Sequence, residues 1–227
     1  MKNAFLYLVS CLILFTACST NRLAHYELRD ANIAAQTFMP PRANVFTDMD
    51  VYIDPDHLLR SAIRIGTSVV REVEAEKARA RLDSAMAMVD VPAIIEEEVL
   101  FQAADMLNFQ PINQTRSADF VFNIDIKRYG IDARSWDDGT YFIIDAHIEL
   151  VDNMEHRRIW KSHVDERESL SPRIFGLDSP IENVLDALTL SALSVEEMAT
   201  GLAYMADFSA GLIVEKLYRD FVRSRRK

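Results

Sequence analysis

The sequence has few cysteines and few glycines. Its two cysteines, Cys11 and Cys18, both lie within the first 18 residues, so the rest of the chain has no internal disulfide and must be held together by packing. Six glycines among 227 residues leave few positions for a backbone cradle around a phosphate group. The motifs G-x-S-x-G and H-E-x-x-H are also absent, and we therefore expect no enzymatic activity and no cofactor.

Acidic residues outnumber basic residues in the sequence. The chain has 25 Lys and Arg against 35 Asp and Glu, a formal net charge of -10, which argues against nucleic-acid binding because neutralising phosphates requires a basic face. Positive charge is concentrated at the C-terminus, in Arg223, Arg225, Arg226 and Lys227. At the end of a helix these side chains stabilise the helix dipole, and contact with anionic lipid headgroups or with an acidic partner is the alternative.

The N-terminus has the pattern of a secretion signal. Lys2 precedes an apolar run from Ala4 to Phe15, which is shorter than the roughly 20 residues that a membrane-spanning helix needs. The run ends in Leu14-Phe15-Thr16-Ala17-Cys18, which resembles the lipobox of bacterial lipoproteins. That resemblance implies a lipidated Cys18 at the mature N-terminus, and a secretory signal cut after Ala17 without lipidation is the alternative.

These features predict three regions. Residues 1–17 form the signal peptide, residues 18–40 hold the lipidated Cys18 and a tether, and residues 41–227 form a single α+β envelope domain. Within the tether, residues 25–35 are expected to form a short helix that ends before Pro40 and Pro41.

Helices are expected on both sides of a central group of strands. A short strand over 50–54 is followed by helix over 57–89, and Asp90 caps a further helix that stops near Asn108. Capping boxes at Ser179 and Ser194 predict helices over about 180–193 and 195–223. Mixed charges between residues 71 and 81 are typical of a solvated helical face.

The central strands show alternation of apolar and polar residues. Strands over 120–127, 141–150 and 159–164 should pair as an antiparallel meander, with a turn near Gly139 and another near Asn153. The side chains expected to face the helices are Phe122, Ile124, Phe142, Ile144 and Trp160. The predicted fold class is therefore α+β, with an antiparallel sheet of three to five strands backed by helices and a long helical segment before the meander.

The meander also carries histidines and carboxylates that could bind a metal. The candidates are His147, His156 and His163, with Asp145, Glu149 and Asp152 nearby in the sequence. None of these pairs has a recognised ligand interval, so we expect polar or solvent-facing side chains and no metal site.

The order of elements resembles a known class of envelope proteins. The run from Ala118 to Ile131, the strands that follow it and the terminal amphipathic helices are similar to the periplasmic auxiliary lipoproteins of ABC-type transport systems. This resemblance implies a non-catalytic accessory module for a transport or assembly machine, anchored through Cys18 to the outer membrane, facing the periplasm and binding an envelope protein. A carrier of a small hydrophobic ligand, with Met- and Phe-rich helices as its pocket wall, is the alternative; a hydrolase with dispersed site residues is a third.

The anchor is testable by substitution. We expect Cys18→Ala to leave the domain folded but to release it from membranes, because no later segment is apolar for long enough to insert. Cell fractionation measures the release, and the intact mass of the wild-type protein is the control. A mature mass without added acyl chains would contradict lipidation.

Overall fold

Six strands form one sheet in the computed structural model, which describes residues 21–39, 44–46, 80–133, 140–176 and 192–226. The strands are β1 (Asn32–Phe38), β2 (Asn44–Phe46), β3 (Gln110–Pro111), β4 (Phe120–Ala133), β5 (Thr140–Asp152) and β6 (Arg157–Ser169). The helices are α3 (Val91–Leu107) and α5 (Val195–Arg225), and short 3-10 turns lie at η1 (Leu23–His25), η3 (Thr115–Ser117) and η4 (Pro172–Phe175). Residues 80–88 are also helical.

The centre of the sheet is the predicted antiparallel meander. β4 pairs with β5, with Phe122 opposite Leu150, and β5 pairs with β6, with Leu150 opposite Trp160. The strand order is β3-β1-β4-β5-β6, and β2 pairs with β4 further along the same edge. The α+β class is confirmed, and the sheet is mixed because β1, β2 and β3 all join it in parallel pairs.

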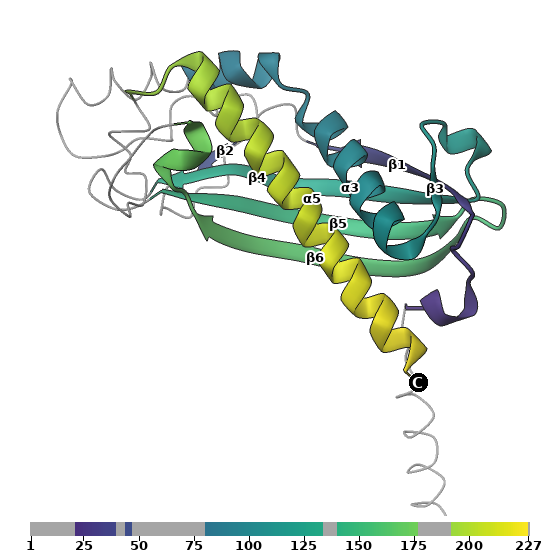
Figure 1. Cartoon of the computed structure of the whole chain (residues 1–227). Helices are drawn as coiled ribbons and strands as arrows, with labels where there is room; N and C mark the ends of the chain where they lie inside the picture. Colours follow the sequence, from purple (N-terminus) through teal and green to yellow (C-terminus); the bar gives the residue numbers. More distant parts are fainter. Residues whose placement is uncertain (1–20, 40–43, 47–79, 134–139, 177–191, 227) are drawn as a thin grey trace, which may run out of the picture.

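One face of the sheet forms the core, and both α3 and α5 cover it (Figure 1). The five side chains expected to face the helices, Phe122, Ile124, Phe142, Ile144 and Trp160, are at most 2% exposed. The buried hydroxyl of Tyr129 in β4 donates a hydrogen bond to the carbonyl oxygen of Leu202 in α5, at 3.1 Å. Burial raises the pKa of this phenol well above its ordinary value, so Tyr129 is a neutral donor that links sheet to helix.

The capping residues identified in the sequence mark the ends of both helices. The side chain of Asp90 accepts a hydrogen bond from the Ala93 amide at 3.1 Å, and α3 ends at Asn108, whose φ of 56° is left-handed. At the start of α5, the Ser194 hydroxyl accepts from the Glu197 amide, and the Glu197 carboxylate accepts from the Ser194 amide. The hydrogen bond from the Ser194 amide, followed by one from the Ser194 side chain to the same carboxylate, lowers the pKa of Glu197. The prediction of both helices is confirmed.

The expected helix over residues 25–35 is wrong. Residues 32–38 form strand β1, which runs parallel to β4, and the Asn32 amide donates to the Asp119 carboxylate at 2.7 Å. Ala-rich segments favour helix locally, but here pairing with β4 and burial of Ile33 override that preference. Leu23 and Leu28 are buried as well, so the described part of the expected tether is built into the domain.

Several other expected elements lie outside the described residues. They are the strand over 50–54, the turn near Gly139 and most of the helices over 57–89 and 180–193; the helical residues 80–88 agree with the first of these helices. The strand expected over 159–164 is longer than predicted, because β6 runs from Arg157 to Ser169, and η4 follows it.

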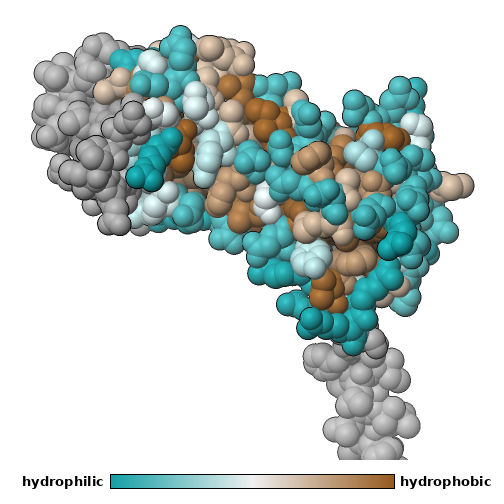
Figure 2. All heavy atoms as spheres, viewed as in Figure 1, coloured by the Kyte–Doolittle hydropathy of each residue, from teal (hydrophilic) through white to brown (hydrophobic). Residues whose placement is uncertain are grey.

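The helix side of the molecule has a mixed surface (Figure 2). Its exposed large apolar side chains include Phe101 on α3 and Tyr204 and Tyr218 on α5, and hydrophilic residues lie among the apolar ones in this view. Among the described residues, no helix combines the length and the apolar character that crossing a bilayer requires.

The buried side chains on the inward face of the sheet should contribute most of its stability. Phe122→Ala removes a fully buried ring, and we expect it to lower the free energy of unfolding by about 3–5 kcal/mol. His147→Ala, on the opposite face of the sheet, should change it by no more than about 0.5 kcal/mol. Urea unfolding of both variants makes the comparison, and equal destabilisation would contradict the assignment of the two faces.

Two glycines of α5 form a matched pair for a second test. A methyl group on Gly201 would overlap the ring of Phe175 from η4, which is itself 1% exposed and has no space to move. A methyl group on Gly211 would meet only the Gln102 side chain, at 3.8 Å. We expect Gly201→Ala to destabilise the protein by about 1–3 kcal/mol and Gly211→Ala to stabilise it by about 0.5–1 kcal/mol.

The measurement is the same denaturant titration for each glycine variant. A Gly201→Ala protein as stable as the wild type would show that η4 does not pack on α5 as described.

Candidate functional site on the outer face of the sheet

The outer face of the sheet is the surface of β4, β5 and β6 that points away from α3 and α5. On β5 it carries Asp145, His147 and Glu149, which alternate with the buried side chains of the core. The Cα partners of these three residues on β6 are Asp165, His163 and Lys161, respectively. The register therefore places polar residues side by side in rows across the strands.

A β-bulge in β4 adds a cation to this face. The pairing of β4 with β5 shifts between Ile126 and Arg128, so Lys127 is an extra residue and Arg128 lies opposite Asp145. Without the bulge, the alternation that buries Ile124 and Ile126 would direct Arg128 toward the core. After the bulge, Tyr129 and Ile131 continue the buried face.

Asp145 is the centre of the hydrogen-bond network. Its Oδ2 accepts from Nε of Arg128 at 3.0 Å, and its Oδ1 lies 2.9 Å from Nε2 of His163. The second guanidinium nitrogen of Arg128 bonds Asp165 at 3.2 Å. Partial burial raises the pKa of Asp145, but the hydrogen bonds from His163 and Arg128 and the charge of Arg128 outweigh it and lower the pKa below its ordinary value.

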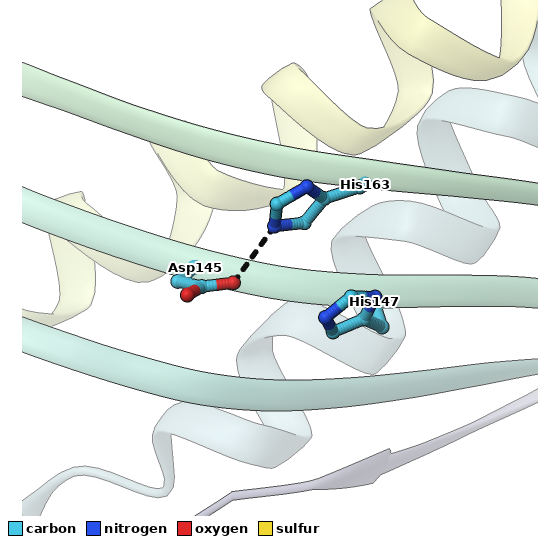
Figure 3. A group of neighbouring side chains, drawn as sticks. All are labelled: Asp145, His147 and His163. Atoms are coloured by element: carbon cyan, nitrogen blue, oxygen red, sulfur yellow. Dashed lines mark hydrogen bonds and ion pairs between the residues drawn. The ribbon is translucent and has the colours of Figure 1, made fainter.

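The two histidines stack on each other across the strands. The rings of His147 and His163 are 4.5 Å apart at their centroids and nearly parallel, with an interplanar angle of 7° (Figure 3). The stack holds the two imidazoles side by side on the outer face of the sheet. A neutral imidazole has a free nitrogen lone pair, which is the form that binds metal ions.

Of the six metal-binding candidates in the sequence, the structure brings three together. One ligand atom from each of Asp145, His147 and His163 lies within 4.8 Å of the others. Asp152 instead accepts hydrogen bonds from the Met154 and Glu155 amides in the β5–β6 turn.

The other two candidates have different surroundings. His156 lies in the same turn with a φ of 50°, and Glu149 forms an ion pair with Arg158 at 2.8 Å. Pairs of this exposed kind contribute at most about 1 kcal/mol each.

No pattern in the sequence indicated that Arg128 belongs to this group. It follows a regular alternating run, and the bulge that turns it outward has no glycine or proline to mark it. The expected lipidation site, Cys18, lies outside the described residues.

No protein-family model matches the chain, and no curated protein matches it. Among solved structures, it is similar to a Xanthomonas campestris protein of the family DUF330, with 13% identity over 85% of this chain and 89% of that one, at a TM-score of 0.38. It is also similar to PelC, solved as a dodecamer, from Paraburkholderia phytofirmans, with 10% identity over 77% and 88% of the two chains and a TM-score of 0.33.

A further similar structure is a candidate lipoprotein from Caulobacter crescentus CB15. Its identity is 13%, over 56% of this chain and 84% of that chain, and its TM-score is 0.22. Likenesses at these scores do not assign a function to the chain.

Proposed function

We propose that the protein is a lipid-anchored envelope protein that acts as a non-catalytic accessory module for a transport or assembly machine. The main support for the proposal is the position of residues 21–26 beside the C-terminal end of α5, whose last turn carries the basic residues Arg223 and Arg225 (Figure 1).

Several contacts fix that place. The Asn21 side chain donates to the carbonyl oxygen of Asp220 at 3.1 Å, and the Arg22 amide donates to the carbonyl oxygen of Ile159 at 2.7 Å. Arg225 donates to the carbonyl oxygen of Tyr26 at 3.3 Å. The first residues of the domain are thus bound both to the edge strand β6 and to the end of α5.

The distance from Cys18 to this point is short. Asn21 is three positions after Cys18, so a fully extended chain spans at most about 11 Å between them. A lipid on Cys18 therefore brings the end of α5 close to the headgroups. Arg223, Arg225 and Arg226 would each gain about 1 kcal/mol at an anionic surface, whereas the acidic remainder of the chain would gain nothing there.

The outer face of the sheet supports the accessory role. Near Val121 this face is covered by Ala118 and Ile112, but along β5 and β6 it carries exposed and half-buried charged side chains arranged in pairs, such as Arg128 with Asp145 and Arg158 with Glu149. A rigid polar surface on a tethered domain suits recognition of an envelope protein through charge complementarity.

The carrier alternative has less support. The expected pocket wall was formed by Met- and Phe-rich helices, but Met198 and Met205 of α5 are at most 2% exposed and belong to the packed core. Side chains therefore occupy the helix–sheet interface of the described residues, and we do not propose a hydrophobic-ligand carrier.

Site-specific photo-crosslinking in intact cells tests the accessory role. We expect a crosslinker at Lys161, on the outer face, to give one adduct of defined mass, because a partner docks there. The matched control is a crosslinker at Phe101, which is 67% exposed on the solvent side of α3 and should give no such adduct.

The same crosslinking experiment also tests the lipid anchor. In the Cys18→Ala background the Lys161 adduct should be lost or much weakened, because the domain no longer stays near its partner at high local concentration. Identical products from both positions, or an adduct that does not depend on Cys18, would contradict an anchored accessory module.

A further inference from the structure

We propose that Asp145, His147 and His163 form a binding site for a divalent transition-metal ion, with zinc as the preferred ion. The three residues occupy two positions on β5 and the facing position on β6, and all three side chains project from the outer face (Figure 3). This site does not depend on the lipid anchor or on the proposed accessory role.

The spacing of the donor atoms is close to that of a zinc site. Zinc binds carboxylate oxygen and imidazole nitrogen at about 2.0–2.2 Å, which separates the ligand atoms of a tetrahedral site by about 3.3–3.6 Å. Oδ1 of Asp145 and Nε2 of His163 are already 2.9 Å apart, and all three ligand atoms lie within 4.8 Å. A bound ion would replace the proton that these two atoms now share. It would also draw the ring of His147 toward Asp145 and His163.

The side chains have freedom to make that adjustment. His163 is 46% exposed, so its ring can turn without displacing core residues. The backbone positions, in contrast, are fixed by the continuous pairing of β5 with β6 on both sides of the His147–His163 pair. Ligands on paired strands are held more precisely than ligands on loops, which favours a preformed site.

Arg128 orients the carboxylate. By holding Oδ2 of Asp145 at 3.0 Å, it leaves Oδ1 directed at the histidines, as outer partners of metal ligands do. The positive charge of Arg128 repels a nearby cation. This charge is partly neutralised by Asp165, whose Oδ1 accepts a hydrogen bond from Nη2 of Arg128 at 3.2 Å. Asp125 lies opposite His147 on the other side of β5, where it forms an ion pair with Lys127, so this pair adds no net charge beside the site.

The donor set determines the class of ion. Two imidazoles and one carboxylate suit zinc and neighbouring transition metals, whereas calcium and magnesium prefer sites made of oxygen atoms. Three protein ligands leave a fourth position of a tetrahedral ion free for water or for another group.

The experiment is a titration with zinc of the protein as isolated from cells, without a histidine tag. Binding is monitored by isothermal calorimetry. We expect one zinc ion per chain for the wild type. His147→Ala, His163→Ala and Asp145→Asn should each weaken binding by at least about tenfold, since even the loss of an outer partner has that effect. Co²⁺ in place of zinc should give the visible absorption of tetrahedral coordination, and each substitution should abolish it.

His156→Asn is the matched control, because asparagine tolerates the left-handed backbone at this position and the residue lies outside the cluster. It should bind zinc as the wild type does, and circular dichroism checks that every variant remains folded. Absence of zinc binding by the wild type, or equal binding by the three cluster variants and the control, would overturn the proposal.

Discussion

The register between β4, β5 and β6 determines which side chains form the core and which form the outer face. Because side chains alternate along a strand, this register directs Phe122, Ile144 and Trp160 to one face, where α3 and α5 cover them. The same alternation leaves Asp145, His147 and their neighbours on the other face. The core and the candidate site therefore depend on the same register, and a shift of the strand pairing by one residue would destroy both.

Trp160 connects this pattern to the ends of the chain. Its ring is fully buried, and its Nε1 donates to the carboxylate of Asp220 in α5 at 3.0 Å. The neighbouring carbonyl of Ile159 accepts from Arg22 at the start of the described chain. An edge strand, the last helix and the N-terminal segment thus meet at one place, which is why the point where an anchor would leave the domain is fixed relative to the sheet.

The outer face has room for both proposed roles, which overlap only at Asp145 and Arg128. The ion pairs around Glu149 and Arg158 lie toward the β5–β6 turn, while Asp145 and the stacked histidines lie nearer the middle of the strands. An ion bound there would add positive charge to an acidic protein at the surface where we expect a partner. Charge at such a surface affects the rate of association and the choice of partner more than affinity.

Local signals in the sequence were enough to predict several elements of the fold. Alternation predicted the inward faces of β4 and β5, and the side chains of Asp90 and Ser194 predicted where α3 and α5 begin, since each acts within four residues of its own position. The tertiary structure alone decided that residues 32–38 form a strand, because their partner is β4, more than 80 residues away. It also decided the bulge before Arg128 and the meeting of Asp145 and His147 with His163, because such contacts depend on strand register and leave no spacing in the sequence that would reveal them.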